Sequence, residues 1–296
     1  MKSLIKNLIL LPLAVLNYLA FMYCFLINNI RNGLASSWLD TQLEKNHSLK
    51  KIITHSNKDK TIKLLLFTPN WICRFRAETF STKEPETLEW IDDSEDNGVL
   101  FDIGANVGLY SLYFASSKNG KVYAFEPSVF NLALLAKNIY GNNLQDKIKI
   151  ITNPLTKANQ FANFTLSSIE EGGALSAFGA EHGHDGEAIK KSLSYQTLGL
   201  SLDFLLFNKI ISDYPNLIKI DVDGIEHLIL AGATETLKHP SCKTVLIEIN
   251  DSFAEHAKSA TKILIDCGFK LKEKRRSDTI GAVKFAETFN QIWIKT

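Results

Sequence analysis

The sequence predicts an α/β protein built on a parallel sheet with crossover helices. From position 99 onward, short apolar runs alternate with longer helical patterns, the order typical of βαβ units. Residues 99–103 form such a run, and a turn containing Gly104 and Gly108 leads into a helical pattern. A second run, 121–125, ends at Glu126. This strand, turn and helix form the unit with which open α/β sheets hold nucleotide-like ligands.

Length and composition predict one large domain with an appendage. The chain has 296 residues, with 33 basic and 32 acidic side chains, a balance that gives no electrostatic footprint for nucleic acid. The four cysteines lie far apart, which fits free thiols in a reducing compartment better than a disulfide framework or a zinc site. We divide the chain into a hydrophobic helix (1–30), a linker (31–60), a β-ribbon with a helix (61–97) and the main domain (98–296).

Residues 8–27 are twenty residues without a charge, the length of a bilayer's hydrocarbon core. Pro12 and Asn17 weaken the pattern, and no small-residue cleavage site follows, which argues against a cleaved signal peptide. We expect a membrane anchor; a buried or interfacial helix is the alternative. More basic residues follow the segment than precede it, which favours a membrane-associated protein with a cytoplasmic catalytic domain.

The part of the chain before position 98 predicts two strands and one helix. Residues 62–67 and 71–77 flank a proline turn, and in the second run Trp71, Cys73 and Phe75 alternate with polar or aliphatic residues. Arg74 and Arg76 then lie on the opposite face, where contact with solvent is a commoner role than contact with substrate. Residue 85 is a proline at a first helical position and opens a helix through position 91.

The glycine turn favours S-adenosylmethionine over a dinucleotide. The dinucleotide fingerprint G-x-G-x-x-G has its second and third glycines replaced by Asn106 and Leu109, so the backbone cannot approach a pyrophosphate as closely. Asp102 suits a cationic amino acid, such as the methionine part of S-adenosylmethionine, better than phosphate. Glu126 lies where a carboxylate accepts hydrogen bonds from both ribose hydroxyls. A turn without any ligand is the alternative.

After Glu126, a helix, a strand (147–152) ending in Asn153 and Pro154, and a strand at 161–167 are expected. Residues 168–196 contain five glycines, together with His182 and His184, and we interpret them as a substrate-side lid. The two histidines suit a flexible polar loop better than a metal site.

The second informative run, 217–220, delivers Asp221 and Asp223 to the carboxyl end of a strand, beside the first turn if the strand order reverses there. A helix with Glu226 at its start follows, and then a fifth strand (244–250) containing Glu248. A metal ion held by Asp221, Asp223 and Glu248 is chemically feasible, but we predict no metal. A helix at 253–267 and a closing hairpin of 269–273 with 290–294 complete the sheet.

Four stretches in this order resemble the FkbM-type family of S-adenosylmethionine-dependent methyltransferases: FDIGANVGLYSLYFA, VYAFEPSVFNLALLAKNI, LIKIDVDGIEHLILAGA and VLIEIN. The resemblance implies a Rossmann-like, seven-stranded methyltransferase sheet, mostly parallel with one antiparallel strand. It also implies methyl transfer to an oxygen of a sugar, glycan or secondary metabolite. The matching positions imply that the cofactor is bound by Asp102, Gly104, Asn106, Gly108, Glu126 and Asp221.

Methyl transfer needs an aligned acceptor oxygen and the removal of its proton. We expect Asp221 to orient the acceptor or act as base, with Asp223 as a second catalytic candidate and His182, His184 and His227 as weaker ones. The predicted anchor makes a lipid-linked sugar a reasonable acceptor. Two alternatives are an inactive membrane-associated scaffold on the same fold and an NAD-dependent oxidoreductase, which the glycine pattern disfavours.

Overall fold

The structure is a computed structural model that describes residues 11–12, 15–16, 18–23, 25–26, 41, 45, 49–57, 60–180, 189, 192–276 and 287–296. Contacts divide the chain into two units, Met1–Leu49 and Lys50–Thr296, each of which is described by itself.

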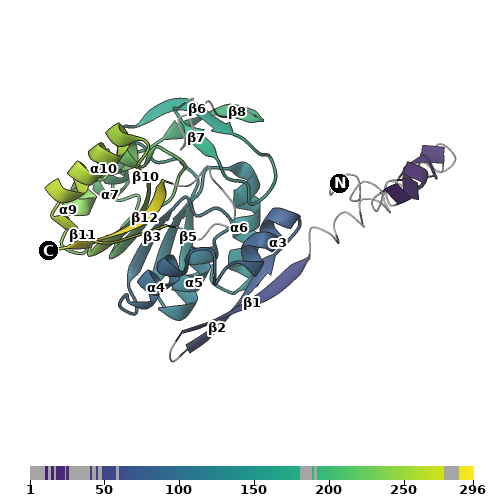
Figure 1. The fold of residues 1–296 in the computed structure, drawn as a ribbon, viewed down its shortest axis with the longest axis horizontal. Helices are drawn as coiled ribbons and strands as arrows, with labels where there is room; N and C mark the ends of the chain where they lie inside the picture. The colour runs from purple at the N-terminus through teal and green to yellow at the C-terminus, as the bar shows by residue number, and fades with distance from the viewer. Residues whose placement is uncertain are drawn as a thin grey trace. The chain divides into compact units, whose positions relative to one another are not determined.

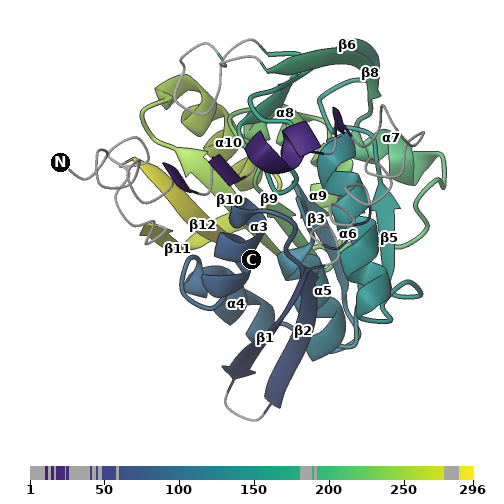
Figure 2. The ribbon, with the colours of Figure 1, turned by 90° about the vertical axis from the view of Figure 1, so that its right-hand side faces the viewer.

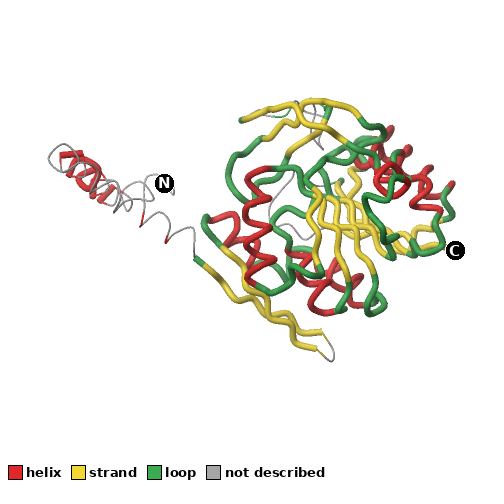
Figure 3. The backbone as a smooth tube through the Cα atoms, turned by 180° about the vertical axis from the view of Figure 1, so that it is seen from behind, coloured by secondary structure: helices red, strands yellow, loops and turns green. Residues whose placement is uncertain are grey.

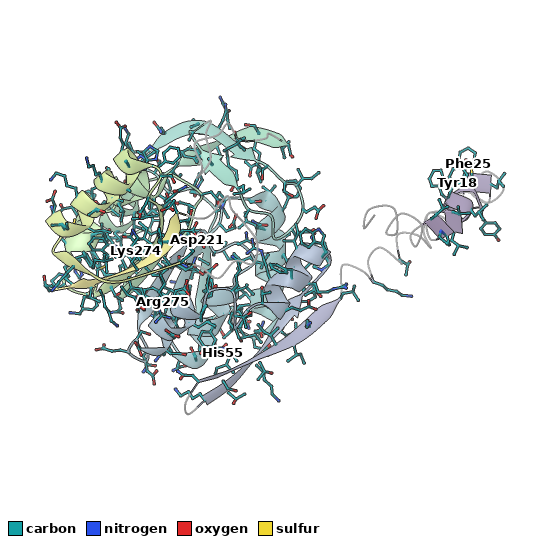
Figure 4. The ribbon with its side chains drawn as sticks, viewed as in Figure 1. Tyr18, Phe25, His55, Asp221, Lys274 and Arg275 are labelled. Carbon is teal, nitrogen blue, oxygen red and sulfur yellow. The ribbon has the colours of Figure 1, made fainter. Side chains whose placement is uncertain are left out.

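In the first unit, the described residues between positions 11 and 26 are helical and exposed, and Figure 4 labels Tyr18 and Phe25 among them. The other residues of the predicted segment 8–27 lie outside the described residues. Within the described part of the chain, no helix is both long and apolar enough to cross a membrane. The hydrophobic N-terminal helix, its role as a membrane anchor and the cytoplasmic location stay predictions.

The second unit is organised around a seven-stranded sheet (Figure 1). Strand β12 is antiparallel to both of its neighbours, whereas the pairs β10–β9, β9–β3, β3–β4 and β4–β5 are parallel. The predicted Rossmann-like sheet, mostly parallel with one antiparallel strand, is confirmed. In spatial order the strands are β11 (Phe269–Arg276), β12 (Thr288–Lys295), β10 (Thr244–Asn250), β9 (Leu217–Ile220), β3 (Val99–Ile103), β4 (Lys121–Phe125) and β5 (Ile148–Ile151).

Helices cover both faces of this sheet, as Figure 3 shows in red against the yellow strands. Side chains alternate along each strand, so Leu100 packs with α4, α5 and α6 on one face, whereas Phe101 packs with α7 to α10 on the other. Figure 2 labels the helices of both groups. The helices of the first face are α4 (Pro85–Asp92), α5 (Leu109–Ser117) and α6 (Val129–Gly141). Those of the second are α7 (Leu202–Phe207), α8 (Glu226–Ala231), α9 (Thr234–Lys238) and α10 (Ala254–Asp266).

Two smaller sheets flank the central one. A three-stranded antiparallel sheet has the order β7 (Ser176–Phe178), β6 (Gln160–Leu166) and β8 (Leu193–Gly199). The hairpin of β1 (Lys50–Asn57) and β2 (Lys60–Phe67) packs on α5 and α6. Part of the stretch 168–196 that we expected to be irregular is therefore strand, because β7 and β8 both pair with β6.

The prediction of a strand at 71–77 is wrong, because these residues form helix α3 (Trp71–Glu78). Asn70 caps the helix: its side chain accepts a hydrogen bond from the Cys73 backbone N–H at 2.9 Å. Cys73 and Ala77, four residues apart, are the buried side chains of α3, whereas Trp71 and Phe75 are exposed. Trp71, Cys73 and Phe75, whose alternation suggested one face of a strand, therefore lie on two different faces of the helix.

The predicted linker 31–60 also contains a strand, β1. Every residue of β1 pairs with β2, from Lys50 opposite Phe67 to Asn57 opposite Lys60. Ile53 is the one buried residue of β1. The strand therefore has the polar composition of a linker, although each of its residues pairs with β2.

Candidate active site

A cavity of about 580 Å³ lies at the carboxyl ends of β3, β4, β9 and β10. Strand β3 lies between β4 and β9, so connections diverge on either side of it, and open α/β sheets bind ligands at such a switch point. Asp221, labelled in Figure 4, lies centrally at this edge of the sheet. The structure brings five of the predicted site residues together in the cavity lining, namely Gly104, Asn106, Glu126, Asp221 and Asp223.

Glycine is required at position 104 because the turn after β3 lies very close to the backbone that follows β9. The φ of Gly104 is +83°, a conformation that favours glycine. A Cβ atom at this position would lie 1.9 Å from the backbone oxygen of Asp221. Because that oxygen belongs to the backbone, no side-chain rotation relieves the clash. The turn after β3 therefore reaches its position against β9 only with glycine.

Glu126 and Asn106 are joined across the turn. The Glu126 carboxylate accepts hydrogen bonds from the backbone N–H of Asn106 at 2.7 Å and of Ser128 at 2.8 Å. Burial raises the pKa of Glu126 to about 7, although these N–H donors act in the opposite direction. Asn106 donates its Nδ2 to Gly173 O at 2.8 Å, while its Oδ1 is buried with no hydrogen-bond partner among the described residues.

Two predicted cofactor residues, Gly108 and Asp102, are not part of the cavity lining. Gly108 begins α5 with φ +89°, and a Cβ there would lie 2.5 Å from Leu135 Cδ1, so it allows α5 and α6 to approach each other. Asp102 is 1% exposed and accepts a hydrogen bond from Ser111 Oγ at 2.6 Å. A direct contact of Asp102 with the cofactor stays a prediction.

Asp221 is held ionised by a buried lysine. Lys219 Nζ, on a side chain that is 2% exposed, lies 2.7 Å from Asp221 Oδ2. Burial opposes ionisation of Asp221, but the charge and hydrogen bond of Lys219, with smaller contributions from Lys83 and Arg76, outweigh it and keep the pKa below its usual range. Sequence analysis missed Lys219, whose only signal is a lysine inside an otherwise apolar strand.

A second ionic group comes from the segment before α4. Lys83 Nζ lies 2.8 Å from Glu84 Oε1, and the Tyr110 hydroxyl donates to Glu84 Oε2 at 2.9 Å. Burial opposes ionisation of Glu84, but Lys83 outweighs it and lowers the pKa of the carboxyl. The Tyr110 ring also lies over Lys219 Nζ, 5.1 Å from its centroid. None of these side chains has a local sequence pattern that would predict the arrangement.

Glu248 also lines the cavity, and burial, followed by the nearby carboxylates, raises its pKa well above the ordinary value. In the described part of the chain, no group of three His, Cys, Asp or Glu side chains is placed to hold a metal ion. This includes the set of Asp221, Asp223 and Glu248.

Residues 170–176, which we call the lid segment, close over the turn. Arg76 Nε donates to Gly172 O at 2.9 Å, and Asn106 Nδ2 binds the next carbonyl. On the far side, Asp223 Oδ2 accepts the backbone N–H groups of Leu175 at 2.7 Å and Ser176 at 3.2 Å. Asp223 therefore fixes the lid segment, a role that the sequence did not predict.

The histidine candidates do not join the cavity lining. His182 and His184 lie outside the described residues. His227 stacks on His256 with 3.9 Å between ring centroids, and burial lowers its pKa to about 4. At the exit of the third strand, Asn153 and Pro154 do line the cavity, and Asn153 Nδ2 donates to Leu198 O at 2.9 Å.

The family model described as the Methyltransferase FkbM domain matches residues 102–271. The chain belongs to the FkbM methyltransferase family. Its FkbM domain therefore begins at the end of β3 and runs into β11, and it contains the glycine turn, Glu126 and Asp221. The hairpin of β1 and β2, the helices α3 and α4, and strand β12 lie outside the match.

Among curated proteins, this FkbM chain is similar to the hexuronic acid methyltransferase AglP of Haloferax volcanii, with 26% identity over 174 residues. The aligned region covers 59% of this chain and 64% of that relative. The chain thus spans somewhat less than two thirds of the relative's length. Among solved structures, it is similar to a precorrin-6y C5,15-methyltransferase of Geobacter metallireducens (TM-score 0.43, 14% identity, 73% of this chain and 90% of that one). A Streptococcus pneumoniae structure in complex with S-adenosyl-L-methionine has a TM-score of 0.43 and 11% identity, with coverage of 71% and 72%.

Proposed function

We propose that the protein is an S-adenosylmethionine-dependent methyltransferase that methylates a hydroxyl oxygen of a sugar. The observation that carries this proposal is the arrangement of Glu126 and Asp221. Their carboxylates line one cavity from the ends of two strands that flank β3, with the Gly104 turn between them.

The residues present suit this cofactor. The cavity volume of about 580 Å³ lies within the range of small-molecule sites. Glu126 accepts two backbone N–H groups and a longer contact from Asn131, which leaves acceptor capacity for a ribose hydroxyl. The buried Asn106 Oδ1 is an acceptor without a donor among the described residues. Such a group is costly unless a ligand supplies the donor.

When bound, S-adenosylmethionine supplies a methyl carbon activated by a positive sulfonium, whose C–S electron pair returns to sulfur as the new O–C bond forms. Asp221 accepts a hydrogen bond from the acceptor hydroxyl and orients its lone pair toward that carbon. As the oxygen becomes positively charged, its proton becomes strongly acidic and passes to Asp221. A carboxylate of low pKa suffices for this late proton transfer, and Lys219 keeps it ionised beforehand.

The acceptor class is supported by the relative from Haloferax volcanii, a hexuronic acid methyltransferase. Transfer to a hydroxyl rather than to a carboxylate follows the wider expectation for this family. A lipid-linked sugar remains part of the proposal as an acceptor to be tested.

The test is transfer of labelled methyl from S-adenosylmethionine to a panel of sugars by the full-length protein. Asp221→Asn should lower kcat by about a hundredfold, because orientation and proton removal are both impaired, while the variant still binds S-adenosylhomocysteine through Glu126. Asp266→Asn, a change at an exposed carboxylate of α10, is the matched control and should leave kcat unchanged. Full activity of Asp221→Asn would refute the assignment. Cofactor binding without transfer to any acceptor would favour the inactive scaffold.

A further inference from the structure

Two exposed aromatic side chains stand where the cavity meets solvent. Trp71 is 69% exposed and Phe75 is 42% exposed, yet both belong to the cavity lining. They are four residues apart on α3 and therefore share one face of that helix. Together they make an apolar strip that continues the cavity wall outward.

Helix α3 holds this strip in a fixed position. Asn70 caps the helix and donates its Nδ2 to Glu171 O at 2.9 Å, and Cys73 Sγ approaches the same carbonyl at 3.2 Å. Cys73 and Ala77 are buried on the opposite face of the helix. The two aromatic rings are therefore presented to solvent by an anchored backbone, so a ligand that covers them pays little ordering entropy.

The charge of the cavity disfavours an anionic ligand. Five carboxylates and three cations line it, namely Glu84, Glu126, Asp221, Asp223 and Glu248 against Arg76, Lys83 and Lys219. Lys83 and Lys219 each have a carboxylate within 2.8 Å. These two lysines are therefore already paired and leave little attraction for an acceptor that bears its own carboxylate, whereas an uncharged polyhydroxyl compound would use the carboxylates as hydrogen-bond acceptors.

We propose that Trp71 and Phe75 form an acceptor subsite that stacks an uncharged sugar ring, next to the ring that receives the methyl group inside the cavity. This rests on the proposed function. A pyranose has an apolar C–H face and a polar rim of hydroxyls; the C–H face packs on the electron-rich face of an aromatic ring. An uncharged sugar would thus explain both the exposure of Trp71 and Phe75 and the carboxylates that line the cavity.

Trp71 itself reports on binding. The chain has four tryptophans, of which Trp90 and Trp293 are buried. In a Trp38→Phe background, Trp71 is therefore the solvent-exposed emitter. Titration with methyl β-D-glucopyranoside, methyl β-D-galactopyranoside and cellobiose should shift its emission to the blue, and methyl β-D-glucuronide should not. An equal response to the glucuronide, or no response to any uncharged glycoside, would overturn the subsite.

The kinetic test uses whichever acceptor the methyl-transfer assay identifies. Trp71→Ala should raise its KM at least tenfold, about 1.4 kcal/mol, with less than a threefold change in kcat and no change in affinity for S-adenosylhomocysteine. Tyr140→Ala is the control, because Tyr140 is 76% exposed on α6 and outside the cavity lining.

The outcomes separate the two proposals. Methyl transfer with an unchanged KM in Trp71→Ala overturns the subsite alone, whereas absence of both transfer and cofactor binding refutes the proposed function. Sedimentation with phosphatidylcholine–phosphatidylglycerol vesicles addresses a different use of the aromatic pair. If Trp71→Ala weakens vesicle binding and leaves KM unchanged, the surface is a lipid contact and the subsite is wrong.

Discussion

Cofactor binding should weaken as pH falls below 7, because Glu126 then takes up a proton. Burial raises the pKa of this carboxyl to about 7, and in the proposed cofactor complex its unprotonated oxygens accept hydrogen bonds from the ribose hydroxyls. Only the ionised fraction of the unliganded protein is competent to bind, so the apparent Kd rises in inverse proportion to that fraction. The perturbation is a change of pH from 8 to 6.

The expected effect is about tenfold. With a pKa of about 7, about nine tenths of Glu126 is ionised at pH 8 and about one tenth at pH 6. The Kd for S-adenosylhomocysteine should therefore be about ten times larger at pH 6, equivalent to about 1.4 kcal/mol. Calorimetric titration with this unreactive product measures it directly.

The matched control is Glu226, whose pKa burial also raises to about 7 but which is not part of the cavity lining. Glu226→Gln should keep the pH dependence of binding, whereas Glu126→Gln should bind weakly at both pH values and show no dependence. A wild-type Kd that does not change between pH 6 and 8, or a dependence that persists in Glu126→Gln, would refute the reasoning.

The same carboxyl also affects folding stability. Between its ordinary pKa of 4.5 and about 7, Glu126 keeps its proton in the folded protein but loses it in the unfolded chain. Because the folded state binds more protons in this window, the contribution of Glu126 makes stability fall as pH rises, by about 3 kcal/mol over the whole window. Urea unfolding of Glu126→Gln at pH 5 and pH 8 should show a smaller difference between the two pH values than the wild type does.

Two further predictions concern the turn and the buried lysine. Gly104→Ala should destabilise the protein by more than the roughly 1 kcal/mol expected for strained backbone alone, because its Cβ would meet the Asp221 carbonyl. Gly179→Ala is the control, because Gly179 also has a positive φ but a Cβ there would make only ordinary contacts. Equal losses of stability for the two variants in thermal unfolding would contradict the clash. Lys219→Met leaves Asp221, whose side chain is 31% exposed, without its buried partner and should lower the free energy of unfolding by about 1 to 3 kcal/mol. Lys262→Met removes an exposed ion pair on a helix and should lower the free energy of unfolding by less than about 1 kcal/mol. Similar free energies of unfolding for the two variants in urea would disprove the stabilising role of Lys219.

Most of the sheet could be predicted from the sequence, because its strands are short apolar runs that end in polar residues. Strands β3, β4, β9 and β10 and the closing hairpin followed from that pattern. Helix α3 did not, since the alternation of Trp71, Cys73 and Phe75 predicts a strand, whereas the helix buries Cys73 and Ala77 at a spacing of four, and the deciding contact is the cap by Asn70. Strand β1 was missed because Ile53 alone turns inward.

In the candidate site, only the residues that directly follow a strand could be predicted from the sequence. Glu126 and Asp221 follow strands, so their meeting at one edge of the sheet was predictable. Glu84 lies 18 residues before Asp102, outside the family match, and its place beside Tyr110 depends on how α4 packs. Such contacts between distant segments leave no local pattern. Lys219 was missed for the same reason, since its pairing with Asp221 exists only in the folded protein.

The lid segment has a consequence for the rate of turnover. Its backbone is bound at Gly172 by Arg76 of α3, at Gly173 by Asn106 of the turn after β3, and at its far end by Asp223. Opening of the cavity on this side therefore requires several hydrogen bonds to break together. For the proposed methyl transfer, we therefore expect the rate of this opening to set an upper limit on kcat that is the same for every acceptor, however tightly each one binds.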